Sequence, residues 1–448
     1  MSKQIIRNAT IVNEQESFVG SVLIENDIII TVHKGNEWVD AGQDCLEIDA
    51  TGLLLLPGVI DDQVHFREPG LTHKGDIYSE SKAAVAGGIT SFFEMPNTKP
   101  QATTIELLEG KFEIASSSSF ANYSFLMGVT NDNIDELKKI NPRYVAGVKM
   151  FMGSSTGNML VDNKQTLNRV FEEIPSLIVT HCEDESTIKA NISHYKSLLG
   201  EDLPVKYHPL IRNDEACYKS SAYAVELATK YNSRLHVFHL SSAKEMSLFR
   251  SDIPLKEKRI TAEVCVHHLW FNDSDYEKYG NRIKWNPSIK SENDRLALIE
   301  AVKSGKIDVI ATDHAPHLWS EKQGNCFQAA SGGPLVQHSL VAMLQMVKNG
   351  VFNIEQVVDK MCHAPAQLFK IEKRGYIRQG YFADLVLVDP DRPWIVTQDN
   401  ILYKCGWSPF ENVQFDASVI STWVNGVRVY HNGSFDEVSK GKRLVFEV

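Results

Sequence analysis

The fold of this chain is decided by the stretch GVIDDQVHFREPG, residues 58–70. Apolar residues at 53–56 and 59–60 predict a buried strand, which runs into a polar cluster and is stopped by Pro69-Gly70. A buried strand that carries histidine, arginine and carboxylates at its C-terminal end is typical of the first strand of an α/β barrel with an active site. The alternative is a strand with a charged turn, in which His65 is a structural core residue.

Seven further apolar runs follow along the chain, and each ends in polar, aromatic or ionisable residues. They cover residues 89–97, 121–130, 146–152, 177–183, 235–241, 260–268 and 308–314. Helical patterns separate most of them, for example 214–231 and 292–304, the latter with Ser291 as N-cap. Two more helices are expected near 334–348 and 354–369. Eight alternations of an apolar strand with a helix predict an α/β fold of the (β/α)₈ TIM-like barrel type.

Both ends of the chain show short alternating strands punctuated by glycine and asparagine. The N-terminal set is too short to bury a core alone. The C-terminal set includes residues 418–429, with Asn425-Gly426 as a hairpin turn. We therefore expect a small composite β-domain, sandwich-like and built from residues 1–53 and 374–448, beside a barrel formed by residues 54–373.

The composition is that of an ordinary soluble globular protein of 448 residues, with a hydrophobic fraction of 43% and a net charge of −11. The interspersed negative charge argues against a nucleic-acid or membrane surface, although a local basic pocket for an anionic substrate stays open. No apolar run approaches the length of a membrane span or forms a signal-peptide core. The seven cysteines form no CxxC pair, which argues against a disulfide framework or a cysteine-type zinc site and fits a cytoplasmic protein.

The polar ends of the predicted strands contain the residues of a metal centre. If all strands are parallel, one face of the barrel holds His65, Lys149, His181, His239 and Asp313. Imidazole and carboxylate ligands suit Zn²⁺ at neutral pH. Each residue alone has a simpler explanation, such as a buried core histidine, an ion-paired lysine or a helix-capping aspartate. All five occupy the same relative place on their strands, which favours the metal centre.

Lys149 is informative about that centre. An ammonium group a few ångströms from a metal ion is repelled by several kcal/mol, even at an effective dielectric constant of about 20. A neutral amine can instead add CO₂ and become an anionic carbamate, whose two oxygens can bridge two metals. We therefore hypothesise that Lys149 is carbamylated.

A set of motifs spread along the whole chain gives a specific resemblance. The motifs are VHFREPGLTHK (64–74), AGGITSFFEMPNTKP (86–100), GVKMFMGSSTG (147–157), THCED (180–184), HVFHLSS (236–242), TAEVCVHHL (261–269), NPSIK (286–290), ATDHAPH (311–317), ADLVLVD (383–389) and GWSPF (406–410). Together they resemble the dihydroorotases of the amidohydrolase superfamily, a group of cyclic amidases that also holds hydantoinases and allantoinases. The resemblance implies one or two zinc ions, with His65 at the first metal, carbamylated Lys149 as the bridge, and His181 and His239 at the second. Asp313 resembles the metal-bound general base.

The resemblance also implies a substrate and its binding residues. The expected reaction is the reversible hydrolysis of dihydroorotate to N-carbamoyl-aspartate, in de novo pyrimidine biosynthesis. Arg67, Asn97, Asn286 and His317 match positions that hold the substrate, and the Gly332-Gly333 loop matches one that contacts its ring amide. The expected partner is this small molecule, and the chain is expected to form a homo-oligomer, either a dimer or a tetramer.

Arg67 is expected to decide between cyclic amides. Its guanidinium can pair with the ring carboxylate of dihydroorotate, aided by Asn97. Hydantoins and allantoin lack that carboxylate and would leave the arginine unpaired. The alternative for Arg67 is a surface ion pair with Glu68.

One position departs from the family. The first strand of these enzymes usually carries HxH, and the first histidine is here replaced by Gln63. An amide oxygen is a much weaker zinc ligand than imidazole, so the first metal position could bind weakly, use Gln63 or water, or stay empty. A degenerate, non-catalytic scaffold for a partner such as aspartate transcarbamoylase is the alternative that Gln63 raises.

Three other histidines are conspicuous but are not expected to be ligands. His236 precedes His239 by three residues on a predicted strand and should point to the opposite face. His267 and His268 either orient the site or have a purely structural role.

Overall fold

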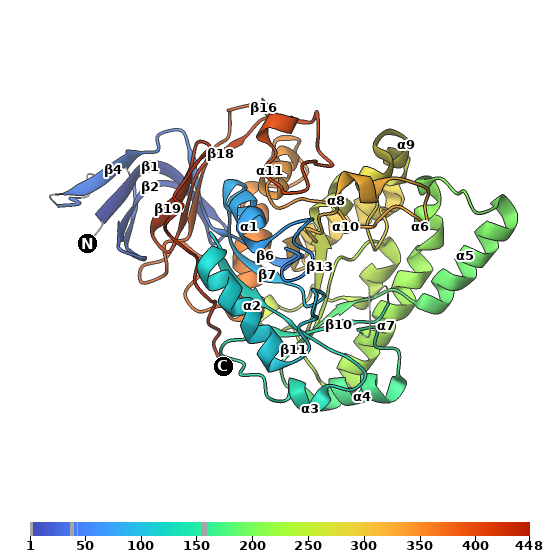
Figure 1. Cartoon of the computed structure of the whole chain (residues 1–448). Coiled ribbons are helices and arrows are strands. Elements are labelled where there is room, and N and C mark those ends of the chain that lie inside the picture. The colour runs from blue at the N-terminus through green and yellow to red at the C-terminus, as the bar shows by residue number, and fades with distance from the viewer. Residues whose placement is uncertain (1–2, 36–39, 43, 154–158) are drawn as a thin grey trace.

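The protein is described by a computed structural model that covers residues 3–35, 40–42, 44–153 and 159–448 (Figure 1). Residues 154–157 of the 147–157 motif lie outside the described residues. The centre of the molecule is a parallel barrel with outer helices. Its strands are β6 (Val59–Val64), β7 (Ile89–Glu94), β8 (Asn122–Phe125), β9 (Met127–Gly128), β10 (Gly147–Phe151), β11 (Leu177–His181), β12 (Leu235–Val237), β13 (Ile260–Cys265) and β14 (Val309–Ala311). The predicted α/β barrel is confirmed.

Neighbouring strands of the barrel pair in parallel register, and β8 and β9 share the third place in the ring. The ring closes between its last and first strands, where the backbone N–H of His65 donates to the carbonyl of His314 at 2.7 Å. All C-terminal strand ends therefore meet at one face, as the sequence pattern predicts.

The apolar run at the start of the barrel is divided between two sheets. Leu54–Pro57 form β5, which pairs with β1 (Lys3–Asn13) and β15 (Leu385–Asp389), whereas Val59 begins β6. Gly58 lies at the junction, where an added Cβ would be 2.0 Å from Oγ1 of Thr90. The absence of a side chain at Gly58 lets the backbone pass this close to β7 while changing sheets.

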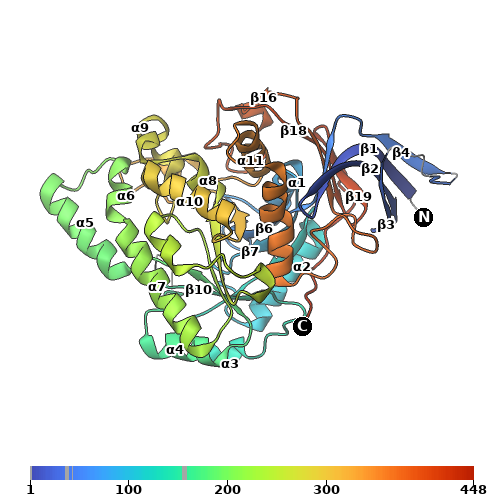
Figure 2. The same cartoon turned by 180° about the vertical axis from the view of Figure 1, so that it is seen from behind.

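Helices surround the barrel on its outer side (Figures 1 and 2). They are α1 (Ile77–Ala86), α2 (Ile105–Ser118), α3 (Ile134–Leu137), α4 (Lys164–Glu173), α5 (Glu185–Leu199), α6 (His208–Ile211), α7 (Asp214–Tyr231), α8 (Val266–Trp270), α9 (Tyr276–Tyr279), α10 (Glu292–Ser304), α11 (Ser339–Lys348), α12 (Ile354–Val358) and α13 (Ala364–Phe369). The bounds predicted for α7 and α10 are confirmed, and Oγ of Ser291 accepts the N-cap hydrogen bond from the N–H of Asp294. The last predicted helix is divided, because a π-helical turn at Asp359–His363 separates α12 from α13.

Both ends of the chain share one sheet beside the barrel (Figure 1). The strand order is β20-β19-β18-β15-β5-β1-β2-β3, with β4 also paired to β1. The remaining strands are β2 (Glu16–Glu25), β3 (Ile28–Lys34), β4 (Cys45–Asp49), β18 (Ser418–Val424), β19 (Val427–His431) and β20 (Ser434–Phe435), and a separate ladder joins β16 (Trp394–Ile395) to β17 (Gln414–Phe415). The indole N–H of Trp423 donates to Oε1 of Gln4 at 3.0 Å, so residues from opposite ends of the chain meet in its core. The composite β-domain is confirmed, and its sequence bounds stay a prediction.

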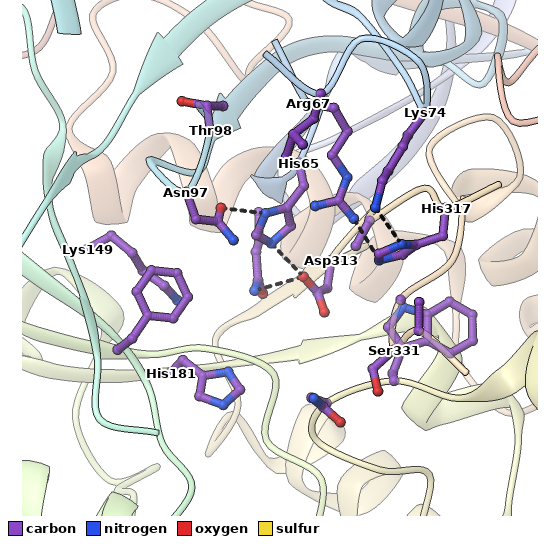
Figure 3. Close-up of a pocket in the computed structure, with 18 of the residues that line it drawn as sticks. His65, Arg67, Lys74, Asn97, Thr98, Lys149, His181, Asp313, His317 and Ser331 are labelled. Atoms are coloured by element: carbon purple, nitrogen blue, oxygen red, sulfur yellow. Dashed lines mark hydrogen bonds and ion pairs between the residues drawn. The ribbon is translucent and has the colours of Figure 1, made fainter. Parts of the chain in front are cut away.

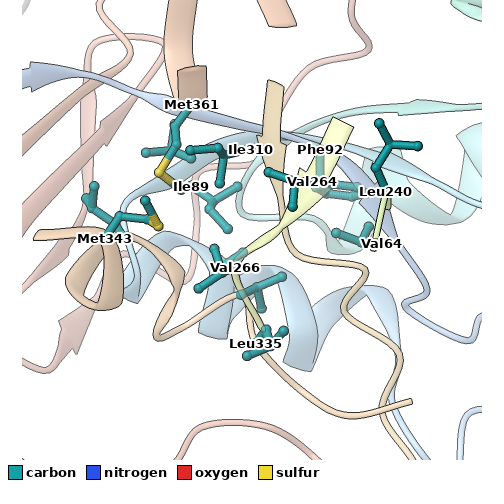
Figure 4. Close-up of a cluster of buried hydrophobic side chains, with 14 of the residues drawn as sticks. Val64, Ile89, Phe92, Leu240, Val264, Val266, Ile310, Leu335, Met343 and Met361 are labelled. Carbon is teal, nitrogen blue, oxygen red and sulfur yellow. The ribbon is translucent and has the colours of Figure 1, made fainter. Parts of the chain in front are cut away.

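The main apolar core lies between the barrel strands and the outer elements (Figure 4). It includes Phe92, Val264 and Ile310 of the strands, Met343 of α11, and Met361. This continuous packing fixes the strand ends that carry the polar face of the barrel.

The cysteines and the helices bear on the expected compartment and on membrane insertion. All seven cysteines are free thiols. Among the described helices, none combines the length and apolar character that crossing a membrane requires.

Candidate functional site

A cavity of about 830 Å³ opens at the C-terminal ends of the barrel strands (Figure 3). Its lining includes the predicted residues Gln63, His65, Arg67, Asn97, Lys149, His181, His239, Asn286, Asp313, His317 and Gly332. Gly333 does not line the cavity. Its backbone carbonyl accepts a hydrogen bond from the N–H of Ala315 at 2.9 Å. An added Cβ at Gly333 would lie 2.7 Å from the Trp285 ring, so this glycine leaves space for the indole that lines the cavity.

The first strand and the last strand meet at Asp313. The side-chain amide of Gln63 donates to Oδ1 of Asp313 at 3.1 Å, and Nε2 of His65 lies 3.2 Å from the same oxygen. The Nδ1–H of His65 donates to Oδ1 of Asn97 at 2.9 Å, which leaves Nε2 facing the carboxylate. Burial lowers the pKa of His65, although Asp313 opposes the shift. Nε2 of a neutral His65 and Oδ1 of Asp313 are then two acceptors that face each other, and a shared cation would satisfy both.

The second pair of predicted ligands comes from β11 and the end of β12. Nδ1 of His181 and Nε2 of His239 are 2.9 Å apart. The Nε2–H of His181 donates to Oε2 of Glu183 at 3.0 Å, and Arg212 donates to the same oxygen at 2.6 Å. A carboxylate on the outer nitrogen fixes the imidazole tautomer and directs its other nitrogen inward, as in many metal sites. Burial and neighbouring positive groups hold the pKa of His239 well below its usual range, so this ring is neutral.

Lys149 reaches the cavity from β10 in an unusual state for a lysine. Its side chain is 1% exposed, and its Nζ has no hydrogen-bond partner in the part of the chain that the structure describes. Two aromatic rings face its ammonium position, with Nζ 4.1 Å from the ring centroid of Phe238 and 5.0 Å from that of Phe151. Burial lowers the pKa of Lys149 to about 8, which makes a neutral amine accessible near physiological pH.

This donor set fits a divalent metal. Imidazoles, a carboxyl group and an amine able to become a carbamate converge from five barrel strands on one cavity. The orphaned Nζ of Lys149 and the His181–His239 pair are the observations that a bound ion would account for. Two groups of three His, Cys, Asp or Glu residues whose ligand atoms all lie within 4.8 Å of one another are found elsewhere among the described residues. They are Asp62, His236 and Glu263, and Cys265, His267 and His268.

The position of His236 differs from the prediction. Its Nε2 lies 3.2 Å from Oδ2 of Asp62, although β12 and β6 are not neighbours in the barrel. A contact between these strands crosses the barrel interior, so His236 points inward, below the cavity. The alternation rule failed because β12 ends at Val237, and His239 has a left-handed φ of 39°.

One corner of the cavity holds two cations, Arg67 and Lys74, of which Lys74 is also paired with Glu321 at 2.8 Å. Nη2 of Arg67 lies 3.2 Å from Nε2 of His317, and Nζ of Lys74 lies 3.1 Å from Nδ1 of the same ring (Figure 3). Burial and the two cations hold the pKa of His317 well below its usual range. A neutral imidazole has one N–H and one acceptor nitrogen, so it cannot accept from both cations at once. An anion bound at this corner would relieve that conflict.

Sequence reasoning missed part of the cavity wall. Lys74, Thr98, Trp285 and Ser331 line it but were given no role. Lys74 lies within the 64–74 motif, which was the available signal. Its relevance depends on its distance to His317, 243 residues away in the chain, which no local pattern reports.

Comparisons with known proteins agree with this geometry. A model described as the dihydro-orotase-like family matches residues 52–245, and one described as the amidohydrolase family matches residues 215–429. A dihydroorotase of Methanosarcina acetivorans is 33% identical over 91% of this chain and 88% of its own length. A dihydroorotase of Geobacter metallireducens is 32% identical over 91% of this chain and 94% of its own.

Solved structures give the same fold. An L-hydantoinase (dihydropyrimidinase) from Arthrobacter aurescens superimposes with a TM-score of 0.92 at 25% identity, covering 99% of this chain and 100% of its own. A dihydropyrimidinase from Brevibacillus agri gives a TM-score of 0.87 at 24% identity, covering 97% of this chain and 96% of its own. The chain therefore belongs to the dihydroorotase family and is a cyclic amide hydrolase of the amidohydrolase fold.

Proposed function

We propose that this chain is a zinc-dependent dihydroorotase, which interconverts L-dihydroorotate and N-carbamoyl-L-aspartate in pyrimidine biosynthesis. The observation that supports this choice of substrate is the corner of the cavity where Arg67 and Lys74 face His317, beside the predicted metal ligands. A ring carboxylate is an acceptor for all three groups, and dihydroorotate carries one. Curated relatives named dihydroorotase support the same assignment.

The metal would be held by the strand-end residues. His181 and His239 would hold one ion, carbamylated Lys149 would bridge, and His65 and Asp313 would face a second. Gln63 borders that second position, but its amide nitrogen points to Asp313 and its oxygen to Cys265. The carbamate would form when the neutral Lys149 nitrogen bonds to the carbon of CO₂ and one N–H proton passes to solvent. A bound zinc ion is a Lewis acid that lowers the pKa of a coordinated water from 15.7 to about 7.

Asp313 is assigned the proton transfer. Its Oδ1 contacts Gln63 and His65, so we assign the transfer to Oδ2. In the hydrolytic direction the water oxygen bonds to the ring carbonyl carbon, and its proton passes to Oδ2. The carbon–nitrogen bond then breaks, and Asp313 returns the proton to the leaving ring nitrogen. A positioned acid–base group of this kind contributes about 10²–10⁴ in rate.

Arg67 is assigned the discrimination between substrates. It is 8% exposed, and its Nε–H donates to the carbonyl of Pro316 at 3.0 Å, which aims Nη2 into the cavity. Glu68 instead accepts the N–H of Ile77 at 3.0 Å, so the side chain offered as the alternative partner is engaged elsewhere. A hydantoin or allantoin would leave the Arg67 guanidinium without an anion, at a cost that a buried charge makes large.

The test is turnover on L-dihydroorotate, hydantoin and allantoin by one zinc-loaded sample, prepared with bicarbonate and assayed for zinc per chain. Turnover confined to dihydroorotate is expected, and Arg67→Met should raise its KM at least tenfold. Lys139→Met, which removes an exposed lysine, is the matched control. Preference for hydantoin or allantoin would transfer the assignment to those relatives. Zinc binding without any turnover would favour the non-catalytic scaffold.

A further inference from the structure

A compact group of donors lies behind the cavity, at the point where β13 becomes α8. Cys265, His267 and His268 each offer one ligand atom, and these three atoms lie within 4.8 Å of one another. Their exposed fractions are 0%, 0% and 2%. None of the three lines the cavity, and the group adjoins the cavity wall only through Gln63, whose Oε1 is 3.9 Å from Sγ of Cys265.

The two imidazoles are arranged as ligands rather than as satisfied core residues. The Nε2–H of His268 donates to the carbonyl of Pro287 at 3.2 Å, which fixes the tautomer and leaves Nδ1 as an acceptor. Nδ1 of His268 has no hydrogen-bond partner among the described residues. The His267 ring has only a weak contact with the backbone of Thr312, so at least one of its nitrogens is also without a partner there. Buried polar atoms normally have a partner, and an orphan indicates a water or ion that belongs there. A backbone carbonyl on the outer nitrogen is the usual support of a metal-bound histidine.

Cys265 lies next to Gln63, the residue that stands where the family usually has the first histidine of its HxH motif. Its Sγ lies 3.9 Å from Oε1 of Gln63 and 3.4 Å from Oε1 of Glu263. The side-chain amide of Gln63 points its nitrogen at Asp313, so its oxygen is turned toward the thiol. A thiol with two imidazoles and an adjoining oxygen is a donor set suited to zinc.

We propose that Cys265, His267 and His268 bind a zinc ion, distinct from the ions of the strand-end centre, with Gln63 Oε1 as the adjoining oxygen donor. The Cys265 thiol loses its proton to solvent on binding, because the thiolate is the ligand form. All donors are buried, so the ion is structural and has no open position for a substrate.

The site would position a wall of the cavity. The ring of His267 stacks on Trp285, with centroids 4.3 Å apart and an interplanar angle of 13°, and His268 binds the carbonyl of Pro287. Asn286, which lines the cavity together with Trp285, lies between these two contacts in the chain. An ion bound to the two histidines would therefore fix the position of the loop that carries Asn286 relative to the strand ends.

The experiment is zinc K-edge X-ray absorption on the full chain loaded with zinc, together with zinc content per chain. A sulfur shell at about 2.3 Å is expected beside nitrogen and oxygen shells at about 2.0–2.2 Å. Cys265→Ser should remove the sulfur shell and lower the zinc content by about one ion per chain. Cys362→Ser is the matched control, because Cys362 is equally buried but donates to the carbonyl of Pro57 at 3.4 Å. Wild-type protein answers the question even if a variant fails to fold.

The outcomes separate this site from the proposed function. A wild-type spectrum fitted by nitrogen and oxygen alone overturns the proposal, and so does a sulfur shell that persists in Cys265→Ser. His181→Asn should keep the sulfur shell while lowering the zinc bound at the strand ends. A sulfur shell in a protein without turnover on any cyclic amide would support this site and contradict the proposed function.

Discussion

Single residues set the chemistry of this cavity, and Asp313 is the one on which the reaction depends. It has a left-handed φ of 46°, and its Oδ1 contacts groups from the first strand. Asp313→Asn keeps the size of the side chain but cannot take a proton, so we expect turnover to fall about 10²–10⁴-fold. Zinc content and dihydroorotate turnover, measured on the same sample, check this. Activity within tenfold of the wild type would remove Asp313 from the proton transfer.

Lys149 makes the stability of the metal-free, CO₂-free protein depend on pH. Burial lowers its pKa in the folded state from 10.5 to about 8, so between these values the unfolded chain binds more protons. The free energy of unfolding should therefore rise with pH across that window, by about 3 kcal/mol at about 1.4 kcal/mol per pKa unit. Below pH 8 the folded protein carries the full cost of burying the charged Lys149 side chain. Urea unfolding of wild type and Lys149→Met at pH 7.5 and 10.5 measures it.

The comparison has a built-in control. Lys139→Met removes a lysine whose side chain is 64% exposed, and it should not alter the pH dependence. The wild type should gain stability relative to Lys149→Met as pH rises. Parallel pH profiles of the free energy of unfolding for the wild type and Lys149→Met would show that burial does not lower the pKa of Lys149.

At the scale of the elements, a buried ion pair joins α2 to the end of β7. Lys111 pairs with Glu94, both side chains are 1% exposed, and Nζ of Lys111 also donates to the carbonyl of Met95 at 2.9 Å. Lys111→Met leaves the Glu94 carboxylate buried without its cation, which should lower the free energy of unfolding by about 3–5 kcal/mol. Adding Glu94→Gln should recover much of this loss. Denaturant unfolding of both single variants and the double variant measures the coupling, and additive losses would contradict it.

Elements are also where sequence reasoning worked best and where it failed. The bounds of α7 and α10 follow from apolar periodicity and the Ser291 cap, because those signals are local. The apolar run around Gly58 gave no sign that it changes sheets, since that depends on the close approach of Thr90. His236 was misplaced because β12 stops one residue later, and the cationic partner Lys74 was missed because His317 is distant in the chain. The sequence motifs were enough to identify the site residues, but their contacts depend on the three-dimensional fold.

At the scale of the whole molecule, Trp423 holds the two ends of the chain together. It is 0% exposed, lies in the apolar cluster of the composite sheet, and donates to Gln4. Trp423→Ala should lower the free energy of unfolding by about 3–5 kcal/mol. The residue does not line the cavity, so the KM of the folded enzyme should stay within twofold. Val438→Ala, at a side chain that is 87% exposed, is the control, and equal stability of the two variants would contradict this role.

The shared sheet also has a consequence for how the protein is made. One edge of β5 pairs with β1 soon after synthesis, but its other edge has no partner until β15 emerges more than three hundred residues later. At about 5–20 residues per second the ribosome needs tens of seconds to deliver it. During that interval a nascent chain carries an open, apolar strand edge of the kind that recruits other chains. Expression yield should therefore depend on translation speed and on chaperones that cover this edge.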